Sequence, residues 1–476
     1  MPLAPEHQLA RLVAEHQRDL RQLREFADYY DNDPPYAYMV PELIAELGDR
    51  LQQLLINWPR LVVDTAEERA DVLGFRVAGV PKADGDLWDI WQANNLDEAS
   101  SQAHTDAMVM GRAFMIISAN PEPDRPPLIT AESPLETHAI LDPATRRVTS
   151  AYKAWTTDGD GDGPPVEHAT LYLPNETRWY VKTSGGEWVD DPEFEADEHQ
   201  LGRVPVVPIV NRPRLRRPLG QSELVDVIPL VNGANKIGTD MMTSAEFHSM
   251  PRRWALGFGP EDFQDAQGRP VSTWSKIAGR IWASTRTRSE GAEVGQFPEA
   301  DLANFHSTLR ALATLVASLY GLPPTYMGLS FDNPPSADGV RSLEARLIKR
   351  VERKSRPWSG SHEDTMRFAD RFVTGVWRPE LVRLETIWRD PATPTRAQAS
   401  DAAVKLYTSG ISTKRQARED VGYTVEQIDR MEADDAAALA SDPIGQMTRA
   451  LSAGQEGASA PGSAGSGSTG SAGGTE

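Results

Sequence analysis

One segment of the sequence has the residue spacing of a calcium-binding loop. Asp158, Asp160 and Asp162 alternate with glycines, and carboxylates at this spacing open the calcium loop of an EF-hand. However, Ala169 stands where the closing bidentate glutamate belongs, and the flanking residues alternate like strands. Because glycine and aspartate also suit tight turns, we predict the polar tip of a β-hairpin here and no calcium site.

A second segment has the glycine spacing of a phosphate-binding loop. Gly233 and Gly238 are separated by four residues, but Thr239 stands where that loop needs a lysine. No strand-like run precedes the segment, although the loop normally connects a strand to a helix. We therefore reject nucleotide binding.

A short basic stretch carries four arginines within six residues: Arg212, Arg214, Arg216 and Arg217. Guanidinium groups bind phosphates, but they are also the usual partners of carboxylates, which this chain has in excess. We favour a subunit-contact or solvent-exposed role over contact with DNA.

The histidines and serines do not form a recognisable catalytic or metal-binding set. His104, His248, His306 and His362 lie far apart in the sequence, without a second ligand at metal spacing. No serine occupies a nucleophile elbow, and the absence of cysteine excludes disulfides, thiolate metal sites and cysteine nucleophiles. We predict packed or surface histidines, no metal, no cofactor and no enzyme activity.

The composition is that of a folded, strongly acidic protein. The chain has 476 residues, long enough for two or more packed regions, and 69 acidic against 49 basic residues give a net charge of -20. This charge disfavours a tight grip on DNA phosphates, but it is compatible with a surface past which DNA slides. The start of the chain predicts a charged amphipathic helix and not a secretion signal. The uncharged run Ala311–Phe331 is broken by Gly321 and two prolines, so we predict no membrane span.

The first half of the chain predicts two helices followed by an α+β region. Apolar spacing favours one helix near the N-terminus and another over Pro41–Trp58. Between residues 60 and 210 short alternating runs dominate, and Asp86–Met110 supplies one or two further helices. The strand-like runs are Leu61–Asp64, Ala113–Ser118, Val148–Trp155, Ala169–Leu173 and Thr177–Lys182.

The second half is mainly helical. Helices are predicted over Ser222–Phe247 and Asp301–Tyr320, with a compact insert, Pro251–Pro298, between them. A long helix that starts near Ser336 should be kinked by Pro357.

The C-terminal part contains a strand, further helices and a tail. Leu381–Trp388 alternates like a strand, and Arg396–Asp435 returns to helices. Thr424 and Gln427 match a capping box at the start of the last helix. Ala453–Glu476 consists almost entirely of small and polar residues, and we predict a disordered tail.

This order of parts resembles the portal proteins of tailed bacteriophages, in particular the siphovirus-type family, over nearly the whole chain. The segments that carry the resemblance are Gly220–Ser222, Gly321–Gly328, Asn333–Ala337, Trp388–Pro391 and Gly410–Ser412. None of them is a catalytic signature. The resemblance implies a mainly helical α+β fold with wing, stem, clip and crown regions, assembled as a ring.

The resemblance also implies a region for each part of the chain. The stem consists of two helices, the clip lies between them, and a tunnel loop follows the second helix. The implied regions are wing 1–218, first stem helix 219–250, clip 251–298, second stem helix 299–322, tunnel loop 323–336, long kinked helix and return strand to the wing 337–395, crown 396–451 and disordered tail 452–476.

Two sets of site residues follow from the resemblance. The tunnel loop would face DNA in a central channel, and the clip tryptophans Trp254, Trp274 and Trp282 would dock adaptor proteins of the head–tail connector. Two prolines stiffen the loop, and its polar side chains offer contact without a cationic grip. The implied DNA-facing residues are Ser330, Phe331, Asp332, Asn333, Pro334, Pro335 and Ser336.

The implied function is that of a ring, typically of twelve copies, at the capsid vertex of the virion. Such a ring conducts double-stranded DNA without sequence specificity during packaging and ejection, and it nucleates capsid assembly in the host cytoplasm. Its implied partners are the major capsid protein, the terminase motor and head–tail adaptor proteins, and no membrane. Two alternatives stay open: another structural virion component, such as a head–tail adaptor or minor capsid protein, and an unrecognised hydrolase that uses a pair of carboxylates.

Overall fold

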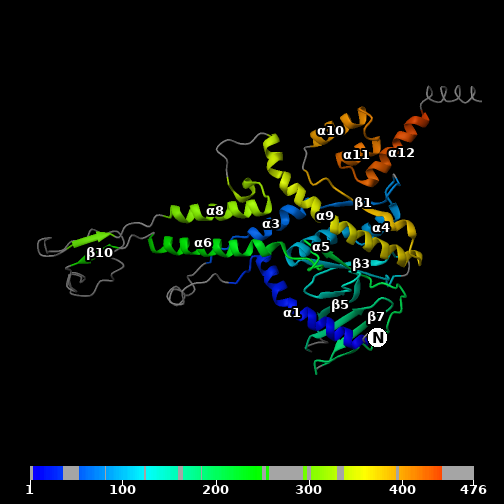
Figure 1. Ribbon diagram of the computed structural model, residues 1–476, viewed down its shortest axis with the longest axis horizontal. Helices are drawn as coiled ribbons and strands as arrows, with labels where there is room; N and C mark the ends of the chain where they lie inside the picture. The colour runs from blue at the N-terminus through cyan, green and yellow to red at the C-terminus, as the bar shows by residue number, and fades with distance from the viewer. Residues whose placement is uncertain are drawn as a thin grey trace, which may run out of the picture. The chain divides into compact units, whose positions relative to one another are not determined.

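The computed structural model describes residues 4–35, 53–80, 82–122, 125–158, 164–183, 185–248, 253–256, 293–296, 302–329, 337–392 and 396–441. Helices and antiparallel sheets alternate in no regular order along these residues, which confirms the predicted α+β class (Figure 1). The chain divides into two compact units, Met1–Ala392 and Thr393–Glu476. This division falls just before Arg396, where the helical C-terminal part was predicted to begin.

A five-stranded meander is covered by the first helix, α1 (Pro5–Asp31). Leu9 and Leu12 of α1 pack against Tyr152, Leu171 and Tyr180 of the sheet. The hairpin predicted around residues 158–163 connects β5 to β6, which pair in antiparallel register, while residues 159–163 lie outside the described residues. The strands, in sheet order, are β4 (Thr137–Leu141), β5 (Val148–Thr157), β6 (Val166–Tyr172), β7 (Thr177–Lys182) and β8 (Trp188–Asp190).

The main hydrophobic core of the first unit includes one face of a second, three-stranded sheet. Its central strand, β2 (Arg112–Ser118), is buried along nearly its whole length, and β3 (Leu128–Glu132) and β9 (Val206–Val210) flank it. The helices α4 (Gly85–Ala93) and α5 (Leu96–Met110) contribute Trp91 and Met108 to this core. They confirm the prediction of one or two helices over Asp86–Met110.

The predicted strand Leu61–Asp64 is wrong, because these residues lie in the helix α3 (Trp58–Glu67). Its alternating β-branched residues resemble a strand, but the Asn57 side chain accepts a hydrogen bond from the Arg60 amide and caps a helix. Val62, Val63 and Ala66 are fully buried on one face. Most of the predicted helix Pro41–Trp58 lies outside the described residues, and its described end is wrong, because residues 53–57 are not helical and Trp58 begins α3.

A two-stranded pair joins distant parts of the first unit. β1 (Val72–Val77) pairs in antiparallel register with β12 (Leu384–Trp388), so that Val72 lies opposite Trp388 and Val77 opposite Leu384. The predicted strand over Leu381–Trp388 is therefore confirmed, and its first turn is the 3-10 helix η6 (Pro379–Arg383). The preceding long helix, α9 (Ala337–Thr374), contains Pro357 and packs against β9 and β12.

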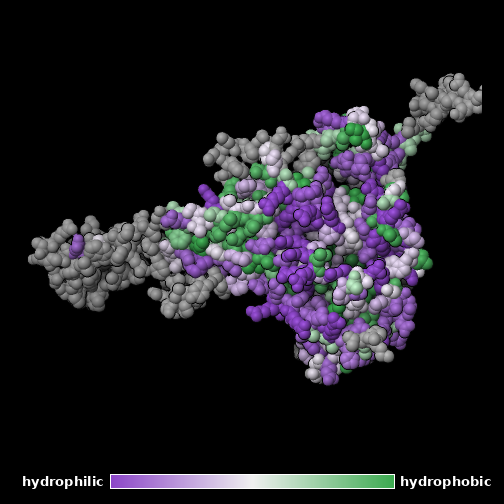
Figure 2. Space-filling model, in the orientation of Figure 1, coloured by the Kyte–Doolittle hydropathy of each residue, from purple (hydrophilic) through white to green (hydrophobic). Residues whose placement is uncertain are grey.

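Two long helices of the first unit lie side by side (Figure 1): α6 (Ile228–His248) and α8 (Ala303–Tyr320). Both were predicted, and the short pair β10 (Arg253–Leu256) and β11 (Glu293–Gln296) falls within the insert between them. Figure 2 shows hydrophobic residues gathered over this helix pair. Leu315 and Leu319 of α8 are about half exposed, so an apolar strip is open for contact. No helix among the described residues is long and apolar enough to cross a bilayer.

The second unit is helical in its described part. It contains α10 (Arg396–Thr408), α11 (Lys414–Val421) and α12 (Val425–Ser441). The predicted capping box is confirmed, because the Gln427 amide donates to the Thr424 hydroxyl and the Thr424 amide donates to the Gln427 side chain. The predicted tail beyond residue 452 lies outside the described residues.

Two histidines that are far apart in the sequence meet in the core. The Nε2 atoms of His104 and His362 are 2.9 Å apart, and both side chains are fully buried. Trp91, Trp358 and Trp388 surround them. Burial lowers the pKa of His362 to about 3, and burial together with the neighbouring His362 lowers the pKa of His104. Both imidazoles are therefore neutral at physiological pH.

This pair should make the first unit sensitive to acid. An imidazole in the unfolded chain titrates near its ordinary pKa of about 6.5, whereas the buried pair resists protonation. As the pH falls from about 6.5 toward 3, the unfolded chain takes up protons that the folded chain excludes, and the free energy of unfolding decreases. We expect the free energy of unfolding of H104F/H362L, measured by urea unfolding, to fall less steeply than that of the wild type between pH 6.5 and 4. The exposed His306→Gln variant should keep the wild-type profile, and an unchanged profile in H104F/H362L would contradict this account.

Candidate functional site

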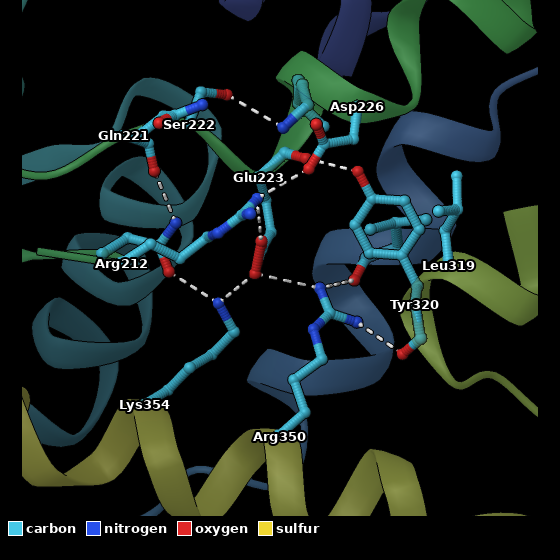
Figure 3. Close-up of polar contacts among 12 residues, drawn as sticks. Arg212, Gln221, Ser222, Glu223, Asp226, Leu319, Tyr320, Arg350 and Lys354 are labelled. Carbon is cyan, nitrogen blue, oxygen red and sulfur yellow. Dashed lines mark hydrogen bonds and ion pairs between the residues drawn. The ribbon is translucent and has the colours of Figure 1, made fainter. Parts of the chain in front are cut away.

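The first unit has a buried ionic junction where its two long antiparallel helices, α6 and α8, meet the rest of the fold (Figure 3). Glu223 begins the 3-10 helix η2 (Glu223–Asp226), directly before α6, and Tyr320 is the last residue of α8. Arg350 and Lys354 lie one turn apart on α9. Asn211 directly follows β9. Segments from four parts of the sequence therefore meet at Glu223 and its immediate neighbours.

Glu223 is surrounded by three cations although only 3% of the residue is exposed. The Lys354 ammonium donates to its Oε1, the Arg350 guanidinium lies 3.3 Å from the same oxygen, and the Arg212 guanidinium lies 3.5 Å from Oε2. Lys354, itself 6% exposed, also donates to the Asn211 side-chain oxygen at 2.6 Å. A buried charge is tolerated only when it is paired and hydrogen-bonded, and this carboxylate meets both conditions.

The pKa values follow from burial and the surrounding charges. Burial alone would raise the pKa of Glu223, but the charges of Lys354, Arg350 and Arg212 outweigh it and lower this pKa to about 2. Burial lowers the pKa of Lys354 to about 8 against the opposing effect of the Glu223 charge. The carboxylate is therefore ionised at neutral pH, and the junction holds as an ionic cluster.

The residues before Glu223 fix its position through tight backbone contacts. Gly220 has φ +80°, and a Cβ added there would lie 2.3 Å from the Gly111 carbonyl oxygen and 2.4 Å from that of Asn211. The Gln221 amide donates to the Asn211 carbonyl at 2.9 Å, and the Ser222 side chain accepts from the Leu224 amide. The Gly-Gln-Ser sequence thus allows this segment to pack closely against β9 and starts η2.

The C-terminal end of α8 closes the junction from another side. The Tyr320 hydroxyl donates to the Glu223 carbonyl oxygen at 2.5 Å, and the Arg350 guanidinium lies over the Tyr320 ring at 4.9 Å from its centre. Two carbonyls of the last turn of α8, at Ser318 and Leu319, accept hydrogen bonds from Arg346. Arginine at the negative end of a helix is stabilising, so α9 caps α8 and holds it in place.

A basic groove of about 920 Å³ lies over this junction. Eight of its lining residues are lysine or arginine, and only two, Glu223 and Asp226, are acidic. Four exposed cations of α9 follow a three-four-three spacing and therefore share one helix face: Arg346, Lys349, Arg353 and Arg356. In a chain of net charge -20, this groove is a local concentration of positive charge suited to an anionic group.

Some of the residues singled out in the sequence lie in this site, and others do not. Gly233 and Gly238 lie inside α6 with no strand before them, which excludes a phosphate-binding loop. Arg212 pairs with two carboxylates, Glu223 and Asp226, as arginine in an acidic chain was expected to do. Arg214 lies in the same loop and lines the groove. No group of three or more histidine, aspartate or glutamate side chains in the described part of the chain could hold a metal ion.

The predicted DNA-facing and adaptor-docking residues are not placed by the structure. The loop residues 330–336, Trp274 and Trp282 all lie outside the described residues. Trp254 belongs to β10, of which only the backbone is described. Their roles therefore stay predictions.

The sequence analysis missed Glu223, Arg350 and Lys354. One signal could have found the two cations, because residues 346–356 contain six lysines and arginines in an otherwise acidic chain. The apolar spacing of this helix indicates only its buried face and says nothing of these cations. Nothing in the sequence marks Glu223 as the carboxylate that these cations surround.

Comparisons with known proteins agree with this architecture. Residues 9–439 match the sequence model of the family described as "Phage portal protein, SPP1 Gp6-like". The portal protein of Mycobacterium phage D29 is 38% identical over 434 residues, which cover 88% of this chain and 86% of the relative. The portal protein of Mycobacterium phage L5 is 38% identical over 427 residues, which cover 86% and 84%. The chain therefore belongs to the phage portal protein family, whose members are structural components of the virion.

Solved structures give more distant matches. A chain of the virion of a native gene transfer agent particle matches with a TM-score of 0.40 and 14% identity, over 76% of this chain and 88% of its own length. A chain of the neck of the native gene transfer agent particle, computed with C12 symmetry, matches with a TM-score of 0.41 and 13% identity, over 80% and 98%.

Removal of the buried carboxylate should strongly destabilise the first unit. Glu223→Leu leaves Lys354 buried without a counter-ion, and breaking a buried pair on one side costs about 3–5 kcal/mol in the free energy of unfolding. E223L/K354M removes both charges and should recover most of this loss. Urea unfolding measures both effects, with Glu352→Gln, which breaks a surface pair, as a control that changes stability by less than about 1 kcal/mol. Equal losses in E223L and E223L/K354M would contradict the pairing.

Proposed function

We propose that this chain is the subunit of a ring at the capsid vertex, through which double-stranded DNA passes during packaging and ejection. The observation that carries the proposal is the family match over residues 9–439, together with two portal proteins at 38% identity that share most of their length with this chain. The half-exposed apolar strip on α8 supports it, because a ring of identical copies needs surfaces that pack against neighbours.

We further propose a role for each part of the chain. The α6–α8 helix pair forms the stem, the insert that contains β10 and β11 forms the clip, and α10, α11 and α12 belong to the crown. The sheets with α1, α3, α4 and α5 form the wing, to which β12 returns. The break between the two compact units after Ala392 supports a separate crown.

In this proposal the loop before α9 reaches the DNA. Residues 330–336 directly precede α9, whose first half is held at its base by the Glu223 cluster. The loop sequence is polar and contains two prolines, so it contacts DNA without a strong electrostatic grip. DNA then slides past while the helix behind the loop stays fixed.

The partners follow from this placement. The ring would contact the major capsid protein at the vertex, the terminase motor during packaging and adaptor proteins at the clip, with Trp254, Trp274 and Trp282 as docking residues. Assembly would take place in the host cytoplasm. The copy number would be twelve, as the resemblance to siphovirus-type portal proteins implies.

The first test is the assembly state of the purified chain. We expect electron microscopy to show rings with a central channel wide enough for duplex DNA, and mass determination in solution to give about twelve copies. A chain that stays monomeric at every concentration and salt tested would overturn the ring, and a small closed oligomer without a channel would favour a head–tail adaptor.

The second test concerns the loop alone. Replacement of Phe331–Pro335 by a Gly/Ser linker of equal length should leave ring assembly intact but abolish DNA packaging in a phage that carries the variant. A matched replacement of residues 159–163, at the hairpin between β5 and β6, should leave packaging unchanged. Normal packaging with the altered tunnel loop would remove its proposed role.

A further inference from the structure

We propose that the basic groove over Glu223 binds the acidic C-terminal end of α1 from the neighbouring copy of this chain in the ring. The inference rests on the proposed ring, and it identifies one specific contact between its copies. Two oppositely charged surfaces of the first unit carry the argument: each has exposed charged side chains that form no ion pair with any described residue.

The groove has more positive charge than its own carboxylates can neutralise. Glu223 and Asp226 are already paired with Lys354, Arg350 and Arg212. By contrast, Arg214, Arg353 and Arg356 are exposed, line the groove and form no ion pair with any described residue. The surplus is thus on the rim of the groove and open to an anionic group from outside.

The shape of the groove selects a peptide over a DNA duplex. A volume of about 920 Å³ accommodates a few side chains, whereas a duplex is too wide to enter the groove and could contact the rim arginines alone. The net charge of -20 also repels a polyanion as long as DNA. A few carboxylates on a narrow helix end meet both constraints.

The end of α1 is acidic where a helix favours cations. Asp28, Asp31 and Asp33 are exposed, and the last turn of α1 has no basic residue. The C-terminal end of a helix carries partial negative charge, so carboxylates there are unfavourable unless a cation lies nearby. None of the three forms an ion pair with any described residue. Arg60, which lies over the Tyr30 ring, is a nearby cation that interacts with Asp31 at longer range, but the three carboxylates stay exposed, so this end can accept further positive charge from another molecule.

The two surfaces lie at the same level of the proposed stem. The Tyr29 hydroxyl at the end of α1 donates to Asn232 in the first turns of α6, and Glu223 beneath the groove lies in η2, immediately before α6. Copies in a ring are related by rotation alone, so two different surfaces can meet only at the same height along the ring axis. With α6 along the channel, the groove and the acidic helix end satisfy this condition.

Charge reversal on both sides tests the contact. R353E/R356E reverses the groove rim, and D28K/D31K reverses the helix end; none of these four side chains forms an ion pair with a residue that the structure describes. We expect each double variant to raise the protein concentration for half-maximal ring assembly by about tenfold or more. For the chain that carries all four changes, the protein concentration for half-maximal ring assembly should return to within about threefold of the wild-type value. An equimolar mixture of the two double variants should also form rings, because each copy then meets a complementary neighbour.

A matched control separates this contact from general effects of charge and folding. R146E/R147E reverses two exposed arginines in the turn between β4 and β5 and should assemble like the wild type. Thermal unfolding of each variant, measured as isolated monomer at low concentration, should match the wild type. Loss of the folded state in R353E/R356E would mean that these arginines act within the chain, which overturns the contact.

The remaining outcomes are equally decisive. Wild-type assembly by R353E/R356E and D28K/D31K would overturn the contact and leave the proposed function intact. If the quadruple variant does not recover ring assembly, the two surfaces do not meet each other. If R353E/R356E assembles normally but loses binding of a fluorescent 30-base-pair duplex, the groove is a DNA site instead. A wild-type chain that forms no rings would overturn the proposed function itself.

Discussion

A single buried carboxylate holds the first unit together at the point where its long helices begin and end. Glu223 connects the start of α6, the end of β9 and the middle of α9, and its carbonyl accepts a hydrogen bond from the last residue of α8. Apolar packing alone would let these helices slide along one another, since hydrophobic contact is non-directional. An ion cluster with fixed partners defines one relative position, and the burial of Lys354 makes any other arrangement costly.

This constraint gives α9 a rigid base. Arg346, Arg350 and Lys354 lie on successive turns of α9. Arg346 donates to the last turn of α8, Arg350 lies over the Tyr320 ring and beside Glu223, and Lys354 donates to Glu223. The same helix also presents its exposed cations away from the core, so one element both fixes the fold and offers a charged surface.

Much of the fold could be predicted from the sequence because local patterns and tertiary packing agree. The apolar stripe of α8 and the capping box of α12 each specify their element within a short window. The prediction failed at Leu61–Asp64, where a short β-branched run fits a strand and a helix equally well and Asn57 decides between them. The site was predictable only in part. His104 and His362, or Glu223 and Lys354, meet across more than a hundred residues, and no local pattern encodes such pairs.

The pairing of β1 with β12 has a mechanical consequence. The chain leaves β12 toward the second unit directly after Trp388, and Trp388 lies opposite Val72, the first residue of β1. A pull on the C-terminal end of β12 therefore reaches the ladder first at this end. At that end Arg389 donates its amide to the Asp71 carbonyl and pairs with the Asp71 carboxylate at 2.5 Å. The position that such a pull reaches first thus carries an ion pair, in addition to the pair of Arg76 with Glu385 at 3.8 Å farther along the ladder.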